Sequence, residues 1–182
     1  DVDGDGLLSI ASGFSRSAWL MGFDATGRKR WAHELERLPP NTRNATQRQL
    51  AMGPDGHVYF FDTLNAASPF DPPAFPGVMS TGHHLVELDP ADGHVVSVVP
   101  VPGLGDLLPE LFRRAPNGDF VALGHLAGNF STRVVVFTAT GTVVATKDWT
   151  FSQSPPSDIF LAATNAGVGL MFAGCQFTRY DR

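Results

Sequence analysis

Two kinds of β-hairpin alternate along this sequence, and this repeat restricts the possible folds more than any other feature. The first kind consists of an apolar run, a short turn that ends in glycine, and a second run that is apolar or alternates between apolar and polar residues. It occurs three times, with the turn glycine at Gly27, Gly93 and Gly141. Glycine favours such a turn because it adopts a positive φ angle without steric cost.

The second kind of hairpin has a turn in which glycine follows Asp, Asn or Ala. It occurs at 54–56, 116–118 and 165–167, each time before a run rich in apolar and β-branched residues. Asp5 and Gly6 fit the same position in front of Leu7. Asp-Gly and Asn-Gly between apolar runs are strong hairpin signals. The alternation of the two hairpins therefore predicts a unit of four antiparallel strands.

The period of this unit predicts the fold class. Four strands that recur every roughly 45–60 residues are typical of the blades of a β-propeller, and no window keeps the spacing of an amphipathic helix. We expect an all-β chain that forms part of a propeller, with about three to four blades of four antiparallel strands. The expected blade-like units are 1–38, 46–103, 108–151 and 157–182. The first unit lacks an opening strand and the last unit lacks a closing hairpin. We therefore expect this piece to belong to a longer chain, and the remainder of that chain to be one of its partners.

One copy of the first hairpin resembles a known repeat. Residues 23–31 resemble the repeat of pyrroloquinoline-quinone-type (quinoprotein-like) propellers, in which a segment with an Asp, a Thr-Gly pair and a Trp joins the last two strands of a blade. The second copy keeps Asp89 and Gly93, whereas the third has Thr138 in place of the Asp. The resemblance implies that Trp31 docks between blades. No residue corresponds to the cofactor or metal positions of the quinoprotein dehydrogenases, so the resemblance implies the fold and not the activity.

The N-terminal segment carries the sharpest chemical motif. Asp1, Asp3 and Asp5 alternate before a glycine, and short carboxylates in this pattern can converge on one hard cation, as in the first half of an EF-hand loop. The segment also resembles the calcium loops of integrin-type propeller repeats, which carry an acidic residue where this chain has Ser9. Ser12 stands where an EF-hand has its bidentate Glu. A calcium site and a solvated acidic turn are both open interpretations. The residues that would bind calcium are Asp1, Asp3, Asp5, Leu7 and Ser9.

Composition excludes several classes of function. The net charge is −5 and the chain has no basic block, whereas a nucleic-acid groove needs clustered Lys and Arg. No apolar run approaches the length of about 18 residues that a membrane span needs.

The single cysteine, Cys175, cannot form an internal disulfide and is expected to be a buried strand residue. His83 and His84 are adjacent and would point to opposite faces of a strand, so no histidine metal site is expected. We also find no serine-hydrolase or phosphate-loop motif.

These observations favour a non-enzymatic propeller module that acts outside the cytoplasm as a binding or structural scaffold. Its expected partner is a protein or a surface glycan, and its expected location is secreted, periplasmic or at the cell surface. Two alternatives are open. The chain could be a fragment of a quinoprotein-like propeller enzyme whose active site lies outside this piece, or a calcium-stabilised surface adhesion module.

Overall fold

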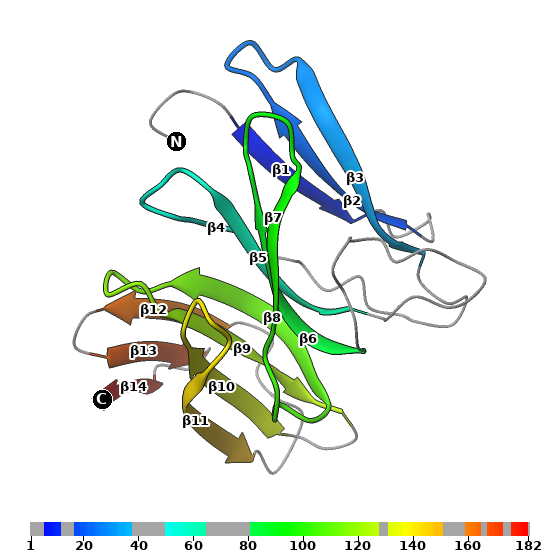
Figure 1. The fold of residues 1–182 in the computed structure, drawn as a ribbon. Helices are drawn as coiled ribbons and strands as arrows, with labels where there is room; N and C mark the ends of the chain where they lie inside the picture. The colour runs from blue at the N-terminus through cyan, green and yellow to red at the C-terminus, as the bar shows by residue number, and fades with distance from the viewer. Residues whose placement is uncertain are drawn as a thin grey trace.

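The computed structural model describes residues 6–11, 17–37, 50–64, 81–127, 131–150, 159–164, 167–172 and 176–181. Within these residues the chain forms strands and turns that are organised in four antiparallel sheets (Figure 1). Among them there is no helix that is long and apolar enough to cross a membrane.

The four sheets follow one another along the chain. The first contains β1 (Gly6–Ala11), β2 (Ser17–Phe23) and β3 (Lys29–Arg37). The second contains β4 (Leu50–Met52), β5 (Val58–Leu64), β6 (Gly82–Leu88) and β7 (Val95–Pro100). The third contains β8 (Leu107–Arg114), β9 (Phe120–Leu126), β10 (Ser131–Phe137) and β11 (Val143–Thr150). The fourth contains β12 (Ile159–Thr164), β13 (Gly167–Phe172) and β14 (Gln176–Asp181).

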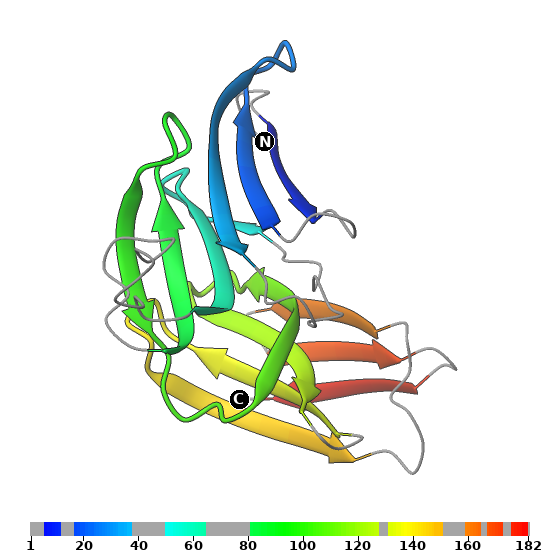
Figure 2. The same ribbon diagram turned by 90° about the vertical axis from the view of Figure 1, so that its right-hand side faces the viewer.

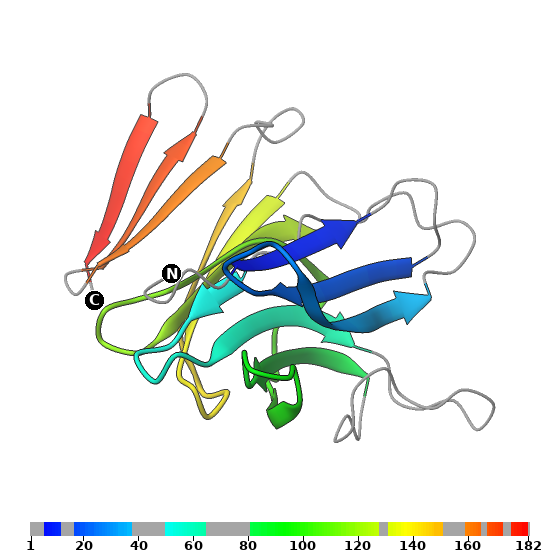
Figure 3. The ribbon, with the colours of Figure 1, turned by 90° about the horizontal axis from the view of Figure 1, so that it is seen from above.

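Each sheet is a meander in which strands that are consecutive in the chain pair with one another. Figures 2 and 3 show the sheets arranged in chain order, each one beside the next. β8 contacts both β4 and β12, so the first strands of the last three sheets lie next to each other. The predicted fold class is confirmed: the chain is all-β, and its second and third sheets are blade-like units of four antiparallel strands.

The last sheet contains a third strand that no sequence pattern marks. β14 pairs with β13 from Phe172↔Gln176 to Gly167↔Asp181 and takes the place of the third strand of the unit. That the unit lacks a complete closing hairpin stays a prediction. β14 has only two aromatic residues, Phe177 and Tyr180, and they are three positions apart. They therefore do not produce the alternation by which a half-buried strand is recognised.

The central strands of the second and third sheets are covered on both faces where their sequences are continuously apolar, at 58–61, 120–123 and 134–137. On β5, Phe60 packs with Trp31 of the first sheet, whereas the next residue, Phe61, packs with Phe112 and Phe120 of the third sheet. The ring centroids of Phe61 and Phe112 are 6.1 Å apart. Because neighbouring residues on a strand point to opposite faces, a stretch that packs on both of its faces needs apolar residues at consecutive positions.

β9 repeats this arrangement one sheet further on. Phe120 and Ala122 belong to the core that is shared with the second sheet. Val121 and Leu123 belong to another core, against which Leu161 of β12 packs. Burial of each such large side chain contributes about 1.5–3 kcal/mol, so the packing of consecutive sheets is the main source of stability for this arrangement.

The turns of the first hairpin kind are closed by side-chain oxygens. Asp24 Oδ1 accepts hydrogen bonds from the backbone N–H of Thr26 at 3.0 Å and of Arg28 at 2.9 Å. In the third copy Thr138 takes this place, and its Oγ1 accepts a hydrogen bond from the N–H of Thr142 at 3.2 Å. The glycines that close these two turns have φ angles of 81° and 79°. A hydroxyl thus replaces the carboxylate without loss of the bond that spans the turn.

Trp31 joins the first two sheets. Its side chain is 8% exposed and packs with Phe60 and Val86 of the second sheet. The indole also lies over Gly22, its register partner on β2, where any Cβ would collide with the ring. The role implied by the resemblance, a tryptophan that docks between blades, is therefore confirmed.

Candidate functional site

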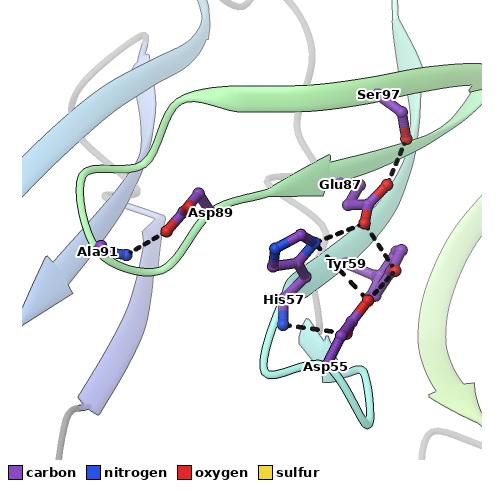
Figure 4. Close-up of polar contacts among 7 residues, drawn as sticks. All are labelled: Asp55, His57, Tyr59, Glu87, Asp89, Ala91 and Ser97. Atoms are coloured by element: carbon purple, nitrogen blue, oxygen red, sulfur yellow. Dashed lines mark hydrogen bonds and ion pairs between the residues drawn. The ribbon is translucent and has the colours of Figure 1, made fainter.

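A group of interacting polar side chains lies at one end of the second sheet (Figure 4). Tyr59 on β5, Glu87 on β6 and Ser97 on β7 are register partners, so their side chains share one face of the sheet. Glu87 Oε1 accepts a hydrogen bond from the Tyr59 hydroxyl at 2.9 Å, and Glu87 Oε2 accepts one from the Ser97 hydroxyl at 2.7 Å. The Glu87 carboxylate is thereby held from both neighbouring strands.

The hairpin between β4 and β5 adds two titratable groups to this ladder. His57 Nδ1 lies 2.7 Å from Glu87 Oε1 and donates a hydrogen bond to it. Asp55 lies in the turn, where its Oδ1 accepts a hydrogen bond from the His57 backbone N–H at 3.2 Å. The other carboxylate oxygen, Asp55 Oδ2, is 3.7 Å from His57 Nδ1. The side chains of Asp55, His57 and Glu87 are 48%, 30% and 17% exposed, so the group opens to solvent on the Asp55 side.

These contacts shift the pKa values of three groups. The hydrogen bond to Glu87 raises the pKa of His57 above its ordinary value, and this effect outweighs partial burial. Burial acts to raise the pKa of Glu87, but hydrogen bonds from His57, Ser97 and Tyr59 together hold that pKa below its ordinary value. Burial and the neighbouring carboxylate raise the pKa of Tyr59, so its hydroxyl stays protonated and acts as a donor.

A second group of metal-ligating residue types lies on the next turn of the same sheet. Asp89, Asp92 and His94 offer ligand atoms within 4.8 Å of one another. However, Asp89 Oδ1 accepts a hydrogen bond from the N–H of Ala91 at 2.7 Å, and Asp92 Oδ1 accepts one from the N–H of His94 at 2.9 Å. The two carboxylates thus serve the backbone of the turn, as Asp commonly does.

A third polar group lies on the third sheet, where a β-bulge interrupts the pairing of β8 with β9 between Pro109 and Leu111. The residue at the bulge, Glu110, has its Oε1 3.1 Å from Nε2 of His125 on β9. The other ring nitrogen, Nδ1, lies 3.1 Å from Thr132 Oγ1. Burial raises the pKa of Glu110, although His125 opposes the shift. The arrangement places a carboxyl group with a raised pKa against an imidazole, the composition of a general acid–base pair.

Two further histidines have structural partners. His83 is buried, and its Nε2 donates a hydrogen bond to the carbonyl oxygen of Leu107 at 2.7 Å. Its ring stacks on Phe61 with the centroids 5.6 Å apart. His84 Nδ1 lies 2.8 Å from the carbonyl oxygen of Gly82. His83 therefore ties β6 to the first residue of the third sheet.

The residues predicted to bind calcium lie mostly outside the described part of the chain. Asp1, Asp3 and Asp5 fall there, and so does Cys175. Leu7 and Ser9 lie on β1, and their backbones pair with Gly22 and Leu20 of β2. The calcium site stays a prediction.

Sequence reasoning missed the groups that the structure brings together. Tyr59 and Glu87 are separated by a long stretch of sequence, and Glu87 stands in an ordinary apolar strand, so no local pattern marks it. The Asp-Gly turn that contains Asp55 is a hairpin signal in the sequence, but the approach of Asp55 and His57 to Glu87 depends on the pairing of β5 with β6. The contact of Glu110 with His125 depends on a β-bulge, and no pattern in the sequence predicts that bulge.

No protein-family model matches this sequence, and none of the curated proteins compared with it matches. Among solved structures, the chain is similar to a candidate 6-phosphogluconolactonase from Bacteroides fragilis, with a TM-score of 0.41 and 15% sequence identity. The match covers 91% of this chain and 44% of the other. The chain therefore spans less than half the length of the solved structure that it matches.

Proposed function

We propose that this chain is part of a non-enzymatic β-propeller that acts outside the cytoplasm as a binding or structural scaffold. The observation that carries the proposal is the way in which the polar side chains of the second and third sheets are used. Glu87 accepts hydrogen bonds from three side chains of its own sheet. Arg133 donates to both carboxylate oxygens of Asp148, at 2.7 and 2.8 Å. Hydrogen-bond networks of this kind, within one sheet, make that sheet rigid.

A rigid stack of sheets is well suited to present turns and loops to a partner. The central strands of the two middle sheets are buried, whereas the outer strand β11 is exposed along most of its length. The surfaces open to a partner therefore include this outer strand, the strand ends and the connections between the strands. Loops on a rigid scaffold are common sites of binding. A protein or a surface glycan is the proposed partner class.

The contact between Glu110 and His125 favours a second candidate, an enzyme that uses general acid–base catalysis. Bulges are common next to active sites, where they change the direction of a side chain. Burial raises the pKa of Glu110, which is the direction that favours a carboxyl group as a proton donor. This candidate agrees with the alternative that the chain is a fragment of a propeller enzyme.

Hydrolysis assays distinguish the two candidates. The protein in its natural length is tested against ester, lactone and glycoside substrates as wild type, as Glu110→Gln and as His125→Gln. The scaffold proposal predicts no turnover above the buffer rate in any of the three proteins. Turnover by the wild type that falls at least about 100-fold in Glu110→Gln, the effect typical of a general acid, would contradict the scaffold and support the enzyme.

Calcium binding and location each need a separate test. Calorimetric titration with calcium of the wild type, Asp3→Ala and Asp5→Ala tests the predicted N-terminal loop, and no heat above the dilution baseline for the wild type would end the adhesion-module alternative. Fractionation of the source cells tests the location, because the proposal predicts the protein outside the cytoplasmic fraction.

A further inference from the structure

Three metal-ligating side chains converge at the end of the second sheet. Asp55, His57 and Glu87 each offer one ligand atom, and these three atoms lie within 4.8 Å of one another. They come from two different structural elements, since Asp55 and His57 belong to the β4–β5 hairpin and Glu87 belongs to β6. Figure 4 shows the three side chains turned toward a common point.

We propose that Asp55, His57 and Glu87 form a binding site for a divalent transition-metal ion of the Zn²⁺ type. This site goes beyond the scaffold role and does not depend on it. The ligand atoms are Asp55 Oδ2, His57 Nδ1 and Glu87 Oε1. Binding displaces the proton on His57 Nδ1 to solvent, so that the nitrogen lone pair faces the ion.

The separations of the ligand atoms fit a small ion. Two ligands at about 2.1 Å from a tetrahedral Zn²⁺ lie about 3.4 Å apart. His57 Nδ1 is 2.7 Å from Glu87 Oε1 and 3.7 Å from Asp55 Oδ2, so the required distance lies between the two observed ones. All three ligand atoms lie within 4.8 Å of one another, so the exposed Asp55 side chain and the His57 ring have to move to bring the three separations to the required distance.

The chemistry of the ligands selects the class of metal. Ca²⁺ and Mg²⁺ prefer shells made only of oxygen, whereas an imidazole nitrogen together with carboxylates suits Zn²⁺ and its neighbours in the first transition row. Three protein ligands leave a fourth position open to solvent on the side of Asp55, which is 48% exposed.

The surroundings hold the ligands in place before the metal binds. Tyr59 and Ser97 donate hydrogen bonds to Glu87 from the two neighbouring strands. Asp55 is fixed through its other oxygen, which accepts a hydrogen bond from the His57 backbone. Hydrogen bonds to ligating carboxylates are typical of metal sites, and their loss usually weakens metal affinity about 10–100-fold.

The test is calorimetric titration of Zn²⁺ into the chelator-treated protein in its natural length. The proposal predicts one equivalent of Zn²⁺ per chain for the wild type, an affinity at least about 100-fold lower for His57→Gln, and one about tenfold lower for Ser97→Ala. Asp55→Asn is the variant that should disturb folding least, because an Asn oxygen can still accept the hydrogen bond in the turn. The Zn²⁺ affinity of this variant should fall by at least about tenfold.

The neighbouring turn provides matched controls. Asp92→Asn and His94→Gln remove the same residue types from an exposed place nearby, and we expect them to leave the Zn²⁺ affinity unchanged. Absence of a one-to-one binding step in the wild type would overturn the proposal. So would an equal loss of affinity in the control variants and in Asp55→Asn, because Zn²⁺ would then be collected by surface groups in general. If His57→Gln does not fold, as judged by circular dichroism, the comparison of Asp55→Asn with Asp92→Asn decides.

Discussion

Trp31 Nε1, on a strand of the first sheet, donates a hydrogen bond to the carbonyl oxygen of Pro90 at 3.0 Å, in the turn between β6 and β7 of the second sheet. The two residues are 59 positions apart in the chain. The contact combines an apolar ring buried between two sheets with a polar bond at its edge. It therefore fixes both the distance between the sheets and the position of one relative to the other.

Replacement of this tryptophan should separate its two contributions. Trp31→Ala is expected to lower the free energy of unfolding by about 3–5 kcal/mol, because it leaves a cavity between the sheets. Trp31→Phe keeps an aromatic ring but loses the bond to Pro90, which is worth about 1 kcal/mol, in addition to a smaller packing loss. Urea denaturation of the two variants measures both values, and equal, small losses would show that Trp31 does not join the sheets.

The turn glycines offer a matched comparison. Gly27 and Gly141 have nearly the same φ, 81° and 79°, so an alanine at either position carries the same backbone strain of about 1–2 kcal/mol. A Cβ at Gly27 meets nothing within 4 Å, whereas a Cβ at Gly141 would collide with the carbonyl oxygen of Pro100. We expect Gly141→Ala to be clearly the more destabilising of the two in thermal denaturation, and equal melting temperatures would contradict the packing of this turn against β7.

The hydroxyl of Thr138 should matter for its turn. Thr138→Ala removes the acceptor of the Thr142 N–H and should lower the free energy of unfolding by about 1 kcal/mol. Thr138→Asp restores the residue that the first two copies carry at this position and should keep most of the stability. Thermal denaturation measures both variants. Equal stability of Thr138→Ala and Thr138→Asp would mean that an acceptor at this position does not stabilise the turn.

The buried His83 should make stability depend on pH. Burial lowers the pKa of His83 below the ordinary value of 6.5, against the opposing effects of the Leu107 carbonyl and Asp106, while His84 lowers it further. The unfolded state therefore binds more protons than the folded state below pH 6.5. The contribution of neutral His83 to stability is complete above pH 6.5 and declines as the pH falls toward the lowered pKa of His83 in the folded state.

A comparison with His83→Gln isolates this contribution. The glutamine amide can still donate to the Leu107 carbonyl oxygen but does not titrate. Between pH 8 and pH 5 the wild type should lose more of its unfolding free energy than His83→Gln, as measured by urea denaturation at each pH. Parallel curves for the two proteins would show that His83 is not held neutral in the folded state.

The turns and the fold class were predictable because they depend on local chemistry. A glycine such as Gly27 closes a turn through its own φ angle, and an Asp such as Asp24 supports it through backbone groups only a few residues away. The apolar runs then require burial on both faces, which a stack of sheets provides. Strand β14 was missed because its aromatic residues do not alternate.

The candidate sites were not predictable, because they depend on contacts between strands that are far apart in the sequence. The ladder of Tyr59, Glu87 and Ser97 exists only because three strands pair in one register. Nothing near Glu87 in the sequence distinguishes it from a solvated strand residue. Glu110 reaches His125 at an irregularity of the pairing, and such an irregularity depends on both strands at once.

A crystal structure of the protein in its natural length tests most directly whether consecutive sheets stack as propeller blades and share their cores pairwise. We predict four sheets in chain order around a common axis, with Trp31 buried between the first two and Phe61 facing the third. Sheets that close on each other in the manner of a β-sandwich, with Trp31 exposed to solvent, would contradict it.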